Sequence, residues 1–246
     1  MKVRGLSVYT DSHAATERRH SPLSGAHDLR AVVFGMNDGL VSNLALMFGV
    51  AGASGAVDAA LLAGAAGLLA GSLSMAAGEY ISVRAQRELH ESQIALERAE
   101  LDRYPEEEAG ELAAIFVARG MTPAQARSLA DGLVADPDLA LQTLAREELG
   151  LDPQALASPW RAAVASFLAF AVGAAVPLLP LLLVVPGHAL LASAAASAVA
   201  LIAFGAAVAL FSGQDVVPAS ARMLLIGAGA ALATWLIGSA LGVAVA

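Results

Sequence analysis

Residues 64–111 read GAAGLLAGSLSMAAGEYISVRAQRELHESQIALERAELDRYPEEEAGE, and this stretch decides the fold. Residues 64–83 are almost entirely apolar, and the residues that follow are charged and periodic. Between Glu79 and Tyr104 there is neither glycine nor proline, so nothing in the sequence ends a helix where the apolar part ends. The pattern predicts one helix that leaves a membrane and carries a carboxylate-rich surface into water.

The rest of the chain has the composition of a multi-span membrane protein with one soluble insert. Of its 246 residues 57% are hydrophobic and 15% are charged, whereas soluble proteins have about 25% charged residues. Each apolar segment is long enough for the ~20 residues that cross a bilayer. The segments are roughly 30–53, 56–83, 160–185, 187–212 and 219–245. We therefore expect an all-α protein with five transmembrane helices.

Four regions follow from this division. Residues 1–29 show no periodicity and are expected to form a flexible tail. Residues 30–83 hold transmembrane helices 1 and 2, and residues 160–246 hold helices 3 to 5. Residues 84–159 form a helical insert between helices 2 and 3, in which Thr122-Pro123 and Asp136-Pro137 each open a short helix.

Two features of the later spans concern packing. Pro177, Pro180 and Pro186 are expected to kink or end the third span, and neighbouring helices would have to cover the carbonyls that proline leaves free. Gly238 and Gly242 are four residues apart, a spacing that permits close helix packing. The spacing leaves open whether the contact lies within the bundle or between two copies.

The basic residues give the orientation. The loops near residues 54–57 and 185–188 and the C-terminus hold none of them. With five spans, every basic residue falls on one side, and the positive-inside rule places the tail and the insert in the cytosol. The basic residues are Lys2, Arg4, Arg18, Arg19, Arg30, Arg84, Arg87, Arg98, Arg103, Arg119, Arg127, Arg146, Arg161 and Arg222.

Several function classes are excluded or disfavoured. The absence of cysteine rules out thiolate metal sites and iron–sulfur clusters. A net charge of −8 argues against nucleic-acid binding. No Ser/His/Asp or Cys/His arrangement and no phosphate-binding loop is present, so neither an enzyme nor an organic cofactor is expected. Three of the five histidines lie in the tail (His13, His20 and His27) and are expected to face solvent.

Three candidate metal ligands lie in the first two spans. Asp38 sits among apolar residues, and an ionisable group at membrane depth is a candidate functional residue. The alternative is a hydrated position near the cytosolic face. Met75 and Glu79 are four residues apart and share a helix face. With Asp38 they would form a mixed sulfur and oxygen site suited to a transition metal, although a methionine in an apolar helix is equally often a packing residue.

The insert carries uncompensated acids. From Glu97 to Glu111 there are seven acidic residues against two basic ones. Two E-x-x-E pairs each share a helix face, and Tyr104-Pro105 between them permits a reversal that would oppose the two faces around a cation. The alternative is a solvated acidic surface, and spacing alone leaves the choice open. The two pairs are Glu97/Glu100 and Glu108/Glu111, and Glu147-Glu148 is a further candidate for the same site.

From residue 29 onward the chain resembles the vacuolar iron transporter family, which includes nodulin-21-like proteins and bacterial homologues. The motifs that carry the resemblance are NDGLVS (37–42), AGSLSMAAGEYISVRAQRE (70–88), REELGL (146–151) and SFLAFAVGAAVPLLP (166–180), together with the E-x-x-E pairs. The resemblance implies a five-span homodimer in membrane lipid that exports Fe²⁺ and Mn²⁺ from the cytosol in exchange for protons.

The resemblance also implies roles for particular residues. Asp38 and Met75 correspond to membrane-embedded metal ligands, and Glu97, Glu100, Glu108, Glu111 and Glu148 correspond to carboxylates of the cytosolic domain. Leu144 stands where the family commonly has methionine, four residues before the last glutamate. Since leucine cannot coordinate a metal, the expected site contains only oxygen ligands at that corner, which puts a preference for Fe²⁺ over Mn²⁺ in doubt.

Together these observations predict a proton-coupled Fe²⁺/Mn²⁺ exporter. The membrane would be the inner membrane in a prokaryote or a vacuole-like membrane in a eukaryote. Two alternatives remain. One is a membrane-anchored metal sensor, and the other is a di-iron carboxylate protein, which is disfavoured because His90 does not follow a glutamate at the Glu-x-x-His spacing.

Overall fold

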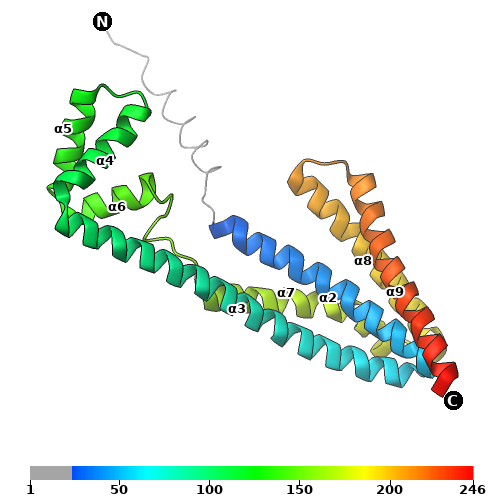
Figure 1. Ribbon diagram of the computed structural model, residues 1–246. Coiled ribbons are helices and arrows are strands. Elements are labelled where there is room, and N and C mark those ends of the chain that lie inside the picture. The colour runs from blue at the N-terminus through cyan, green and yellow to red at the C-terminus, as the bar shows by residue number, and fades with distance from the viewer. Residues whose placement is uncertain (1–23, 246) are drawn as a thin grey trace, which may run out of the picture. The chain divides into compact units, whose positions relative to one another are not determined.

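The computed structural model describes residues 24–245, whose regular secondary structure is entirely α-helical and contains no strand (Figure 1). The all-α prediction is confirmed. Five helices, α2, α3, α7, α8 and α9, are long and apolar enough to cross a membrane, as expected. The helices are α2 (Ser24–Ser54), α3 (Val57–Arg103), α4 (Pro105–Ala118), α5 (Pro123–Val134), α6 (Pro137–Glu147), α7 (Pro159–Leu183), α8 (Pro186–Ser212) and α9 (Val216–Val245).

Helix α3 continues without interruption past the end of its apolar part. It holds 47 residues, which at 1.5 Å per residue make a helix of about 70 Å, more than twice the thickness of a hydrocarbon core. The chain divides into two compact units, and the boundary falls within α3 between Tyr80 and Ile81. Residues 81–159 form the polar unit. The apolar unit holds α2, α8, α9, residues 57–80 of α3 and residues 160–183 of α7.

The apolar unit presents large aliphatic side chains at its surface. Leu62 is 73% exposed, and Leu191 and Leu225 are each 72% exposed. A water-facing surface rarely carries apolar side chains on every helix at this density, because their transfer to an apolar medium is favourable. The distribution is that of helices which face lipid.

Helices α2 and α9 pack at backbone distance. A Cβ atom at Gly238 would overlap the carbonyl oxygen of Gly49, and one at Gly242 would overlap that of Ala53. The Thr234 hydroxyl donates to the Ala45 carbonyl at 2.7 Å across the same seam. The Gly238 and Gly242 pair therefore serves packing within the bundle, which resolves the two alternatives left by its spacing.

This seam gives a stability prediction. We expect Gly238→Ala to lower the melting temperature of the detergent-purified protein by about 3–8 °C, because overpacking costs about 1–3 kcal/mol. Gly229→Ala on the same helix is the matched control, since no atom lies within 4 Å of a Cβ built there. Equal melting temperatures for the two variants, measured by scanning fluorimetry, would contradict the close α2–α9 contact.

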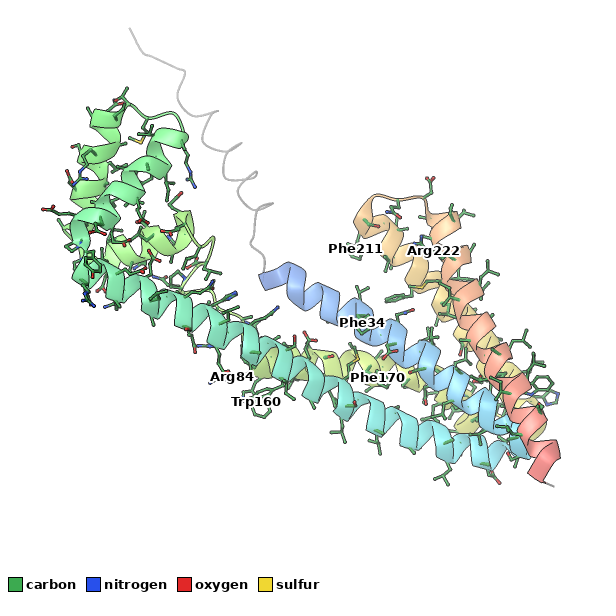
Figure 2. The ribbon with its side chains drawn as sticks, viewed as in Figure 1. Phe34, Arg84, Trp160, Phe170, Phe211 and Arg222 are labelled. Carbon is green, nitrogen blue, oxygen red and sulfur yellow. The ribbon has the colours of Figure 1, made fainter. Side chains whose placement is uncertain are left out.

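Phe170 of α7 lies where three helices meet (Figure 2). A Cβ at Gly71 of α3 would overlap its ring, and one at Gly39 of α2 would overlap its carbonyl oxygen. Helix α7 runs through Pro177 and Pro180 without ending. Neighbouring side chains bond to carbonyls of these turns: Asn43 Nδ2 donates to Ala174 O at 2.8 Å, and Ser193 Oγ donates to Pro177 O at 2.7 Å.

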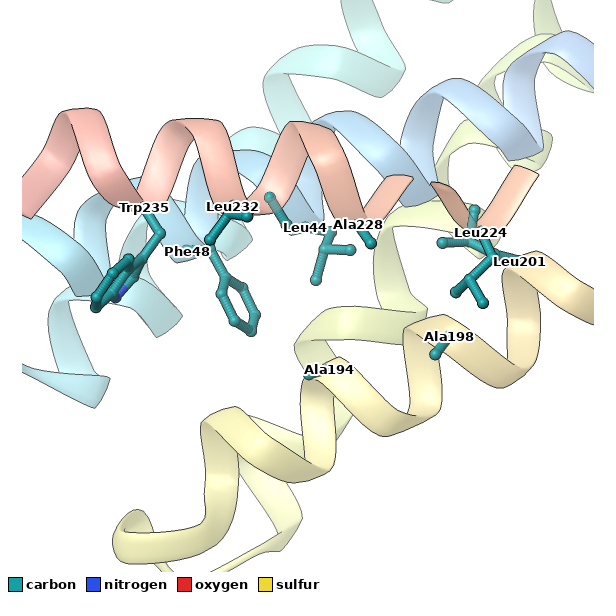
Figure 3. A pocket seen from close by; sticks show the side chains of 10 residues that line it. Leu44, Phe48, Ala194, Ala198, Leu201, Leu224, Ala228, Leu232 and Trp235 are labelled. Carbon is teal, nitrogen blue, oxygen red and sulfur yellow. The ribbon is translucent and has the colours of Figure 1, made fainter. Parts of the chain in front are cut away.

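An apolar cavity of about 300 Å³ lies between α2, α8 and α9 (Figure 3). Phe48, Leu201 and Trp235 are among its lining residues, none of which is charged. A cation would gain no ligand there, so this cavity is not a candidate for metal binding.

The polar unit folds around leucines and alanines. Leu101, Leu112 and Leu144 are buried at its centre. The helix starts predicted at Thr122 and Asp136 are confirmed: Thr122 forms a capping box with Gln125, and the Asp136 carboxylate accepts from two backbone N–H groups of α6.

Some boundaries differ from the prediction. Helix α2 begins at Ser24, inside the segment expected to be a tail, and residues 1–23 lie outside the described part of the chain. Pro186 opens α8 because its fixed φ suits the first helical turn, where no N–H donor is needed. Helix α9 begins at Val216, three residues before the expected start, since Pro218 lies in its first turn.

Candidate metal centre

The reversal that brings the two E-x-x-E pairs together occurs at Tyr104. Helix α3 ends at Arg103 and α4 begins at Pro105, as the sequence predicted. The Tyr104 amide donates to Glu100 O at 2.7 Å, and the Tyr104 carbonyl accepts from the Glu108 amide at 3.1 Å. A single residue therefore closes one helix and caps the next.

Three carboxylates meet beside this turn, and we define Glu97, Glu108 and Glu148 as the candidate metal centre. One carboxylate oxygen from each lies within 4.8 Å of the other two. They come from α3, α4 and the C-cap of α6. Ca²⁺ and Mg²⁺ bind oxygen at 2.0–2.6 Å, so one central ion reaches ligands up to about 5 Å apart. The spacing fits a single divalent cation.

Two of the three carboxylates are buried. Glu97 is 5% exposed and Glu108 is 6% exposed, whereas Glu148 is exposed. Within the described part of the chain, Glu108 Oε2 is buried and accepts no hydrogen bond. A buried carboxylate oxygen without a donor is costly unless a cation or water occupies the space beside it.

Burial and mutual repulsion raise the pKa of these acids. Burial raises the pKa of Glu97 to about 7, helped by the negative charges of Glu148, Glu108, Glu100 and Glu111. The pKa of Glu108 is raised by burial first and by Glu111 next, and the pKa of Glu148 is raised by the same two causes. A hydrogen bond from Glu97 partly offsets the shift at Glu148. The negative charges of the three acids repel one another, and this repulsion favours either protonation or a bound cation.

Glu100 and Glu111 lie at the edge of this charge. Both are exposed, and they stand outside the three-carboxylate group. They are nevertheless close enough to raise the pKa of Glu97, Glu108 and Glu148. All five acids proposed for the insert therefore belong to one electrostatic cluster, with three at its centre and two at its rim.

The structure separates Glu147 from Glu148. Glu148 joins the metal centre, while the Glu147 carboxylate forms an ion pair with Arg119 at the C-cap of α4. Sequence reasoning treated Arg119 only as one of the positive charges that set orientation. Its partner is 28 positions away in the chain, so no local pattern could have identified the pair.

Leu144 lies one helical turn before Glu148 and is fully buried in the core of the polar unit. Neighbouring buried residues include Leu101 and Leu112. The three residues of the metal centre offer oxygen, and Leu144 adds an apolar wall to the core. Oxygen ligands favour Mn²⁺, Mg²⁺ and Ca²⁺ over softer ions.

The candidate residues of the membrane spans belong to the apolar unit, and the three carboxylates belong to the polar unit. Asp38 follows Asn37 and precedes Gly39, which contacts Phe170, and Met75 lies one turn beyond Gly71, which contacts the same residue. Asp38 therefore lies next to, and Met75 one helical turn from, a glycine at which α2 or α3 packs against Phe170. Asp38, Met75 and Glu79 are all partly exposed.

Comparison with known proteins decides the family. The model of the VIT family matches residues 29–239, most of the chain. The chain belongs to the VIT family. The resemblance read from the NDGLVS and REELGL motifs is thereby confirmed.

Individual members of the VIT family align over much of the chain. A vacuolar iron transporter 1 of Oryza sativa is 30% identical over 94% of this chain and 93% of its own length. A vacuolar iron transporter of Acanthamoeba castellanii is 39% identical over 66% of this chain and 59% of its own length. A vacuolar iron transporter homolog 1 of Oryza sativa is 38% identical over 81% of this chain and 67% of its own length.

Proposed function

We propose that this VIT-family protein exports Fe²⁺ or Mn²⁺ from the cytosol, in exchange for protons, for iron and manganese homeostasis. The observation that carries the proposal is the group of three mutually repelling carboxylates of Glu97, Glu108 and Glu148, of which the first two are buried. It occurs in a chain whose relatives are named iron transporters. A buried cluster of like charges is unfavourable by itself and is stabilised by a bound divalent cation.

The metal centre would act as the entrance of the transporter. The distribution of arginines supports a cytosolic position for the polar unit. There Glu100 and Glu111 at the rim would attract cations, and the three central carboxylates would bind them. Transported metal would then bind at Asp38 and Met75, with Glu79 beside Met75 on the same helix face. Helix α3 carries both Met75 and Glu97, so one helix would connect the entrance with the site in the membrane. Metal selection would combine the all-oxygen entrance with the thioether of Met75.

Proton exchange follows from the same ligands. A carboxylate binds a cation only when it is deprotonated, so metal and proton compete for each site. Metal binds on the neutral cytosolic side and is released where protons are more abundant. We propose that the protein works as a homodimer in this exchange.

Flux into proteoliposomes tests the proposed function. With an acidic interior, we expect uptake of Mn²⁺ and Fe²⁺ that exceeds uptake of Zn²⁺ and Co²⁺, accompanied by alkalinisation of the lumen. Collapse of the pH gradient with a protonophore should slow uptake. A protein that binds Mn²⁺ but moves none would instead be a membrane-anchored sensor, and this result would overturn the transport proposal.

The raised pKa of Glu97 predicts how metal binding depends on pH. The pKa of Glu97 is about 7 without metal, so at pH 6 its carboxyl is mostly protonated and a metal must displace that proton. From pH 6 to pH 8 the ionised fraction rises about tenfold, and we expect Mn²⁺ affinity to rise about tenfold and then to level off. Calorimetric titration checks this, and an affinity that stays constant from pH 6 to 8 would contradict it.

A further inference from the structure

Glu148 is delivered to the metal centre by the last turn of α6. Helix α6 ends at Glu147, and Glu148 is its C-cap residue. The chain then turns at Gly150, which has a φ of 66°, and Leu151 N donates to Ala145 O at 2.8 Å. Helix ends fray because their last carbonyls lack helical partners. An interaction that holds the last turn of α6 in place therefore also holds the Glu148 carboxylate in place.

Arg119 is the side chain that ties this turn to α4. It is the C-cap residue of α4, and its Nη2 forms an ion pair with Oε2 of Glu147. The Glu147 side chain is 22% exposed and the Arg119 side chain is 57% exposed, so the pair is shielded from solvent on its carboxylate side. Another ion pair, between Arg98 and Asp138 at 2.8 Å, ties the opposite end of α6 to α3.

The pairing sets the rotation of the turn. Adjacent helical residues point about 100° apart, so the direction of Glu147 also determines the direction of Glu148. With Glu147 held by Arg119, Glu148 faces Glu97 and Glu108. Helix α4 carries Glu108 near its start and Arg119 at its end. Helix α4 thus supplies the Glu108 carboxylate to the centre and, through Arg119, also positions the Glu148 carboxylate.

We infer that Arg119 is a positioning residue for the metal centre, which acts through Glu147 to hold the Glu148 carboxylate opposite Glu97 and Glu108. The inference rests on the proposed capture of metal by these three carboxylates. Residues that orient metal ligands typically contribute 10- to 100-fold in affinity.

The sign of the effect separates positioning from simple charge. If Arg119 were only a positive charge near the acids, its removal would strengthen cation binding by reducing repulsion. If it positions Glu148, its removal weakens binding. We expect Arg119→Gln in the full-length protein to lower Mn²⁺ affinity by about tenfold. Arg87→Gln is the matched control, because it removes the same charge from an exposed pair with Glu91 and should leave the affinity unchanged.

A charge swap tests the pair itself. Arg119→Glu combined with Glu147→Arg keeps the net charge and restores an ion pair between the same two helix ends. We expect its Mn²⁺ affinity to return to within about threefold of wild type, whereas each single charge reversal should weaken binding at least as much as Arg119→Gln. Thermal unfolding of every variant shows whether the protein remains folded.

A metal-free measurement completes the test. Hydrogen exchange in residues 139–148 should be faster in Arg119→Gln than in wild type and should return towards wild type in the swap. An Arg119→Gln variant with unchanged or higher Mn²⁺ affinity, or a swap that fails to recover, would overturn the positioning role alone. A wild-type protein that binds no Mn²⁺ would overturn the proposed capture of metal, and with it the role of Arg119.

Discussion

Glu97→Gln should lower the affinity of the purified protein for Mn²⁺ by about 100-fold, the largest effect expected of any single change in the polar unit. Glutamine keeps the size of the side chain and removes its charge. Contact between a cation and a partly buried carboxylate is worth several kcal/mol, and each 1.4 kcal/mol is a factor of ten. Glu97 is the most buried acid of the metal centre, so its loss should cause the largest decrease in Mn²⁺ affinity.

The stability of this variant distinguishes lost binding from lost folding. Because burial raises the pKa of Glu97 above its ordinary value, ionisation of this group destabilises the metal-free protein as pH rises through about 7. At pH 8 we therefore expect metal-free Glu97→Gln to melt at a higher temperature than metal-free wild type. The pH dependence of its Mn²⁺ binding between pH 6 and 8 should also be weaker than that of wild type, with Glu108 and Glu148 left as the titrating ligands.

Glu91→Gln is the control for this experiment. Glu91 lies on the same helix, and its carboxylate pairs with Arg87 at 2.7 Å. Its loss should leave Mn²⁺ affinity within twofold, the usual scale of an exposed ion pair. Equal affinities for Glu97→Gln and wild type would show that the acids of the polar unit form a solvated surface.

Asp38→Asn should reduce Mn²⁺ flux into proteoliposomes by more than about 90%, while Mn²⁺ binding to the purified protein is retained. Asp38 is a carboxylate within the apolar part of α2, and an ionisable group at that depth is retained for function. Asparagine is isosteric and neutral, so it tests the charge without opening a cavity. The polar unit, which holds Glu97, Glu108 and Glu148, is untouched.

Asp58→Asn is the matched control for transport. Asp58 lies in the first turn of α3 and is exposed, so its loss should change only a helix-end charge, worth below about 1 kcal/mol. Met75→Leu is expected to lower flux less than Asp38→Asn, because it removes a neutral ligand of similar volume. An Asp38→Asn variant that transports Mn²⁺ as fast as wild type would contradict a role for Asp38 in the transport pathway.

Local signals in the sequence predicted the helices well. Tyr104-Pro105, Thr122-Pro123 and Asp136-Pro137 each combine a capping position with a proline at the first helical residue, and α4, α5 and α6 begin there. The absence of breakers after residue 79 likewise predicted that α3 would pass its apolar boundary. Such features depend on residues within one or two turns of each other.

Tertiary contacts were predicted less well. Gly238 and Gly242 indicated a close helix contact, but only the packing on Gly49 and Ala53 shows that it lies within one chain. The two E-x-x-E pairs placed Glu97 and Glu108 on opposed faces. Assignment of Glu148 to the same site depended on family resemblance, because α6 reaches the centre through the packing of α4, α5 and α6.

The spacing of the residues alone could not separate Glu147 from Glu148, and the family resemblance selected Glu148 without giving Glu147 a partner. Both are acidic and adjacent, and only the position of Arg119 shows which one is neutralised. The burial of Glu97 and Glu108 could not be predicted from the sequence either. An exposed acidic run and a buried metal centre have the same composition, and they differ in the 5% and 6% exposures of Glu97 and Glu108.

The most direct measurement is an anomalous difference map from crystals of the full-length protein grown with Mn²⁺ and recorded at the manganese edge. The account predicts a peak within bonding distance of carboxylate oxygens from Glu97, Glu108 and Glu148, and no such peak in crystals of Glu97→Gln. Ordered side chains at these three residues without manganese between them, at saturating Mn²⁺, would contradict the central claim that they capture the metal.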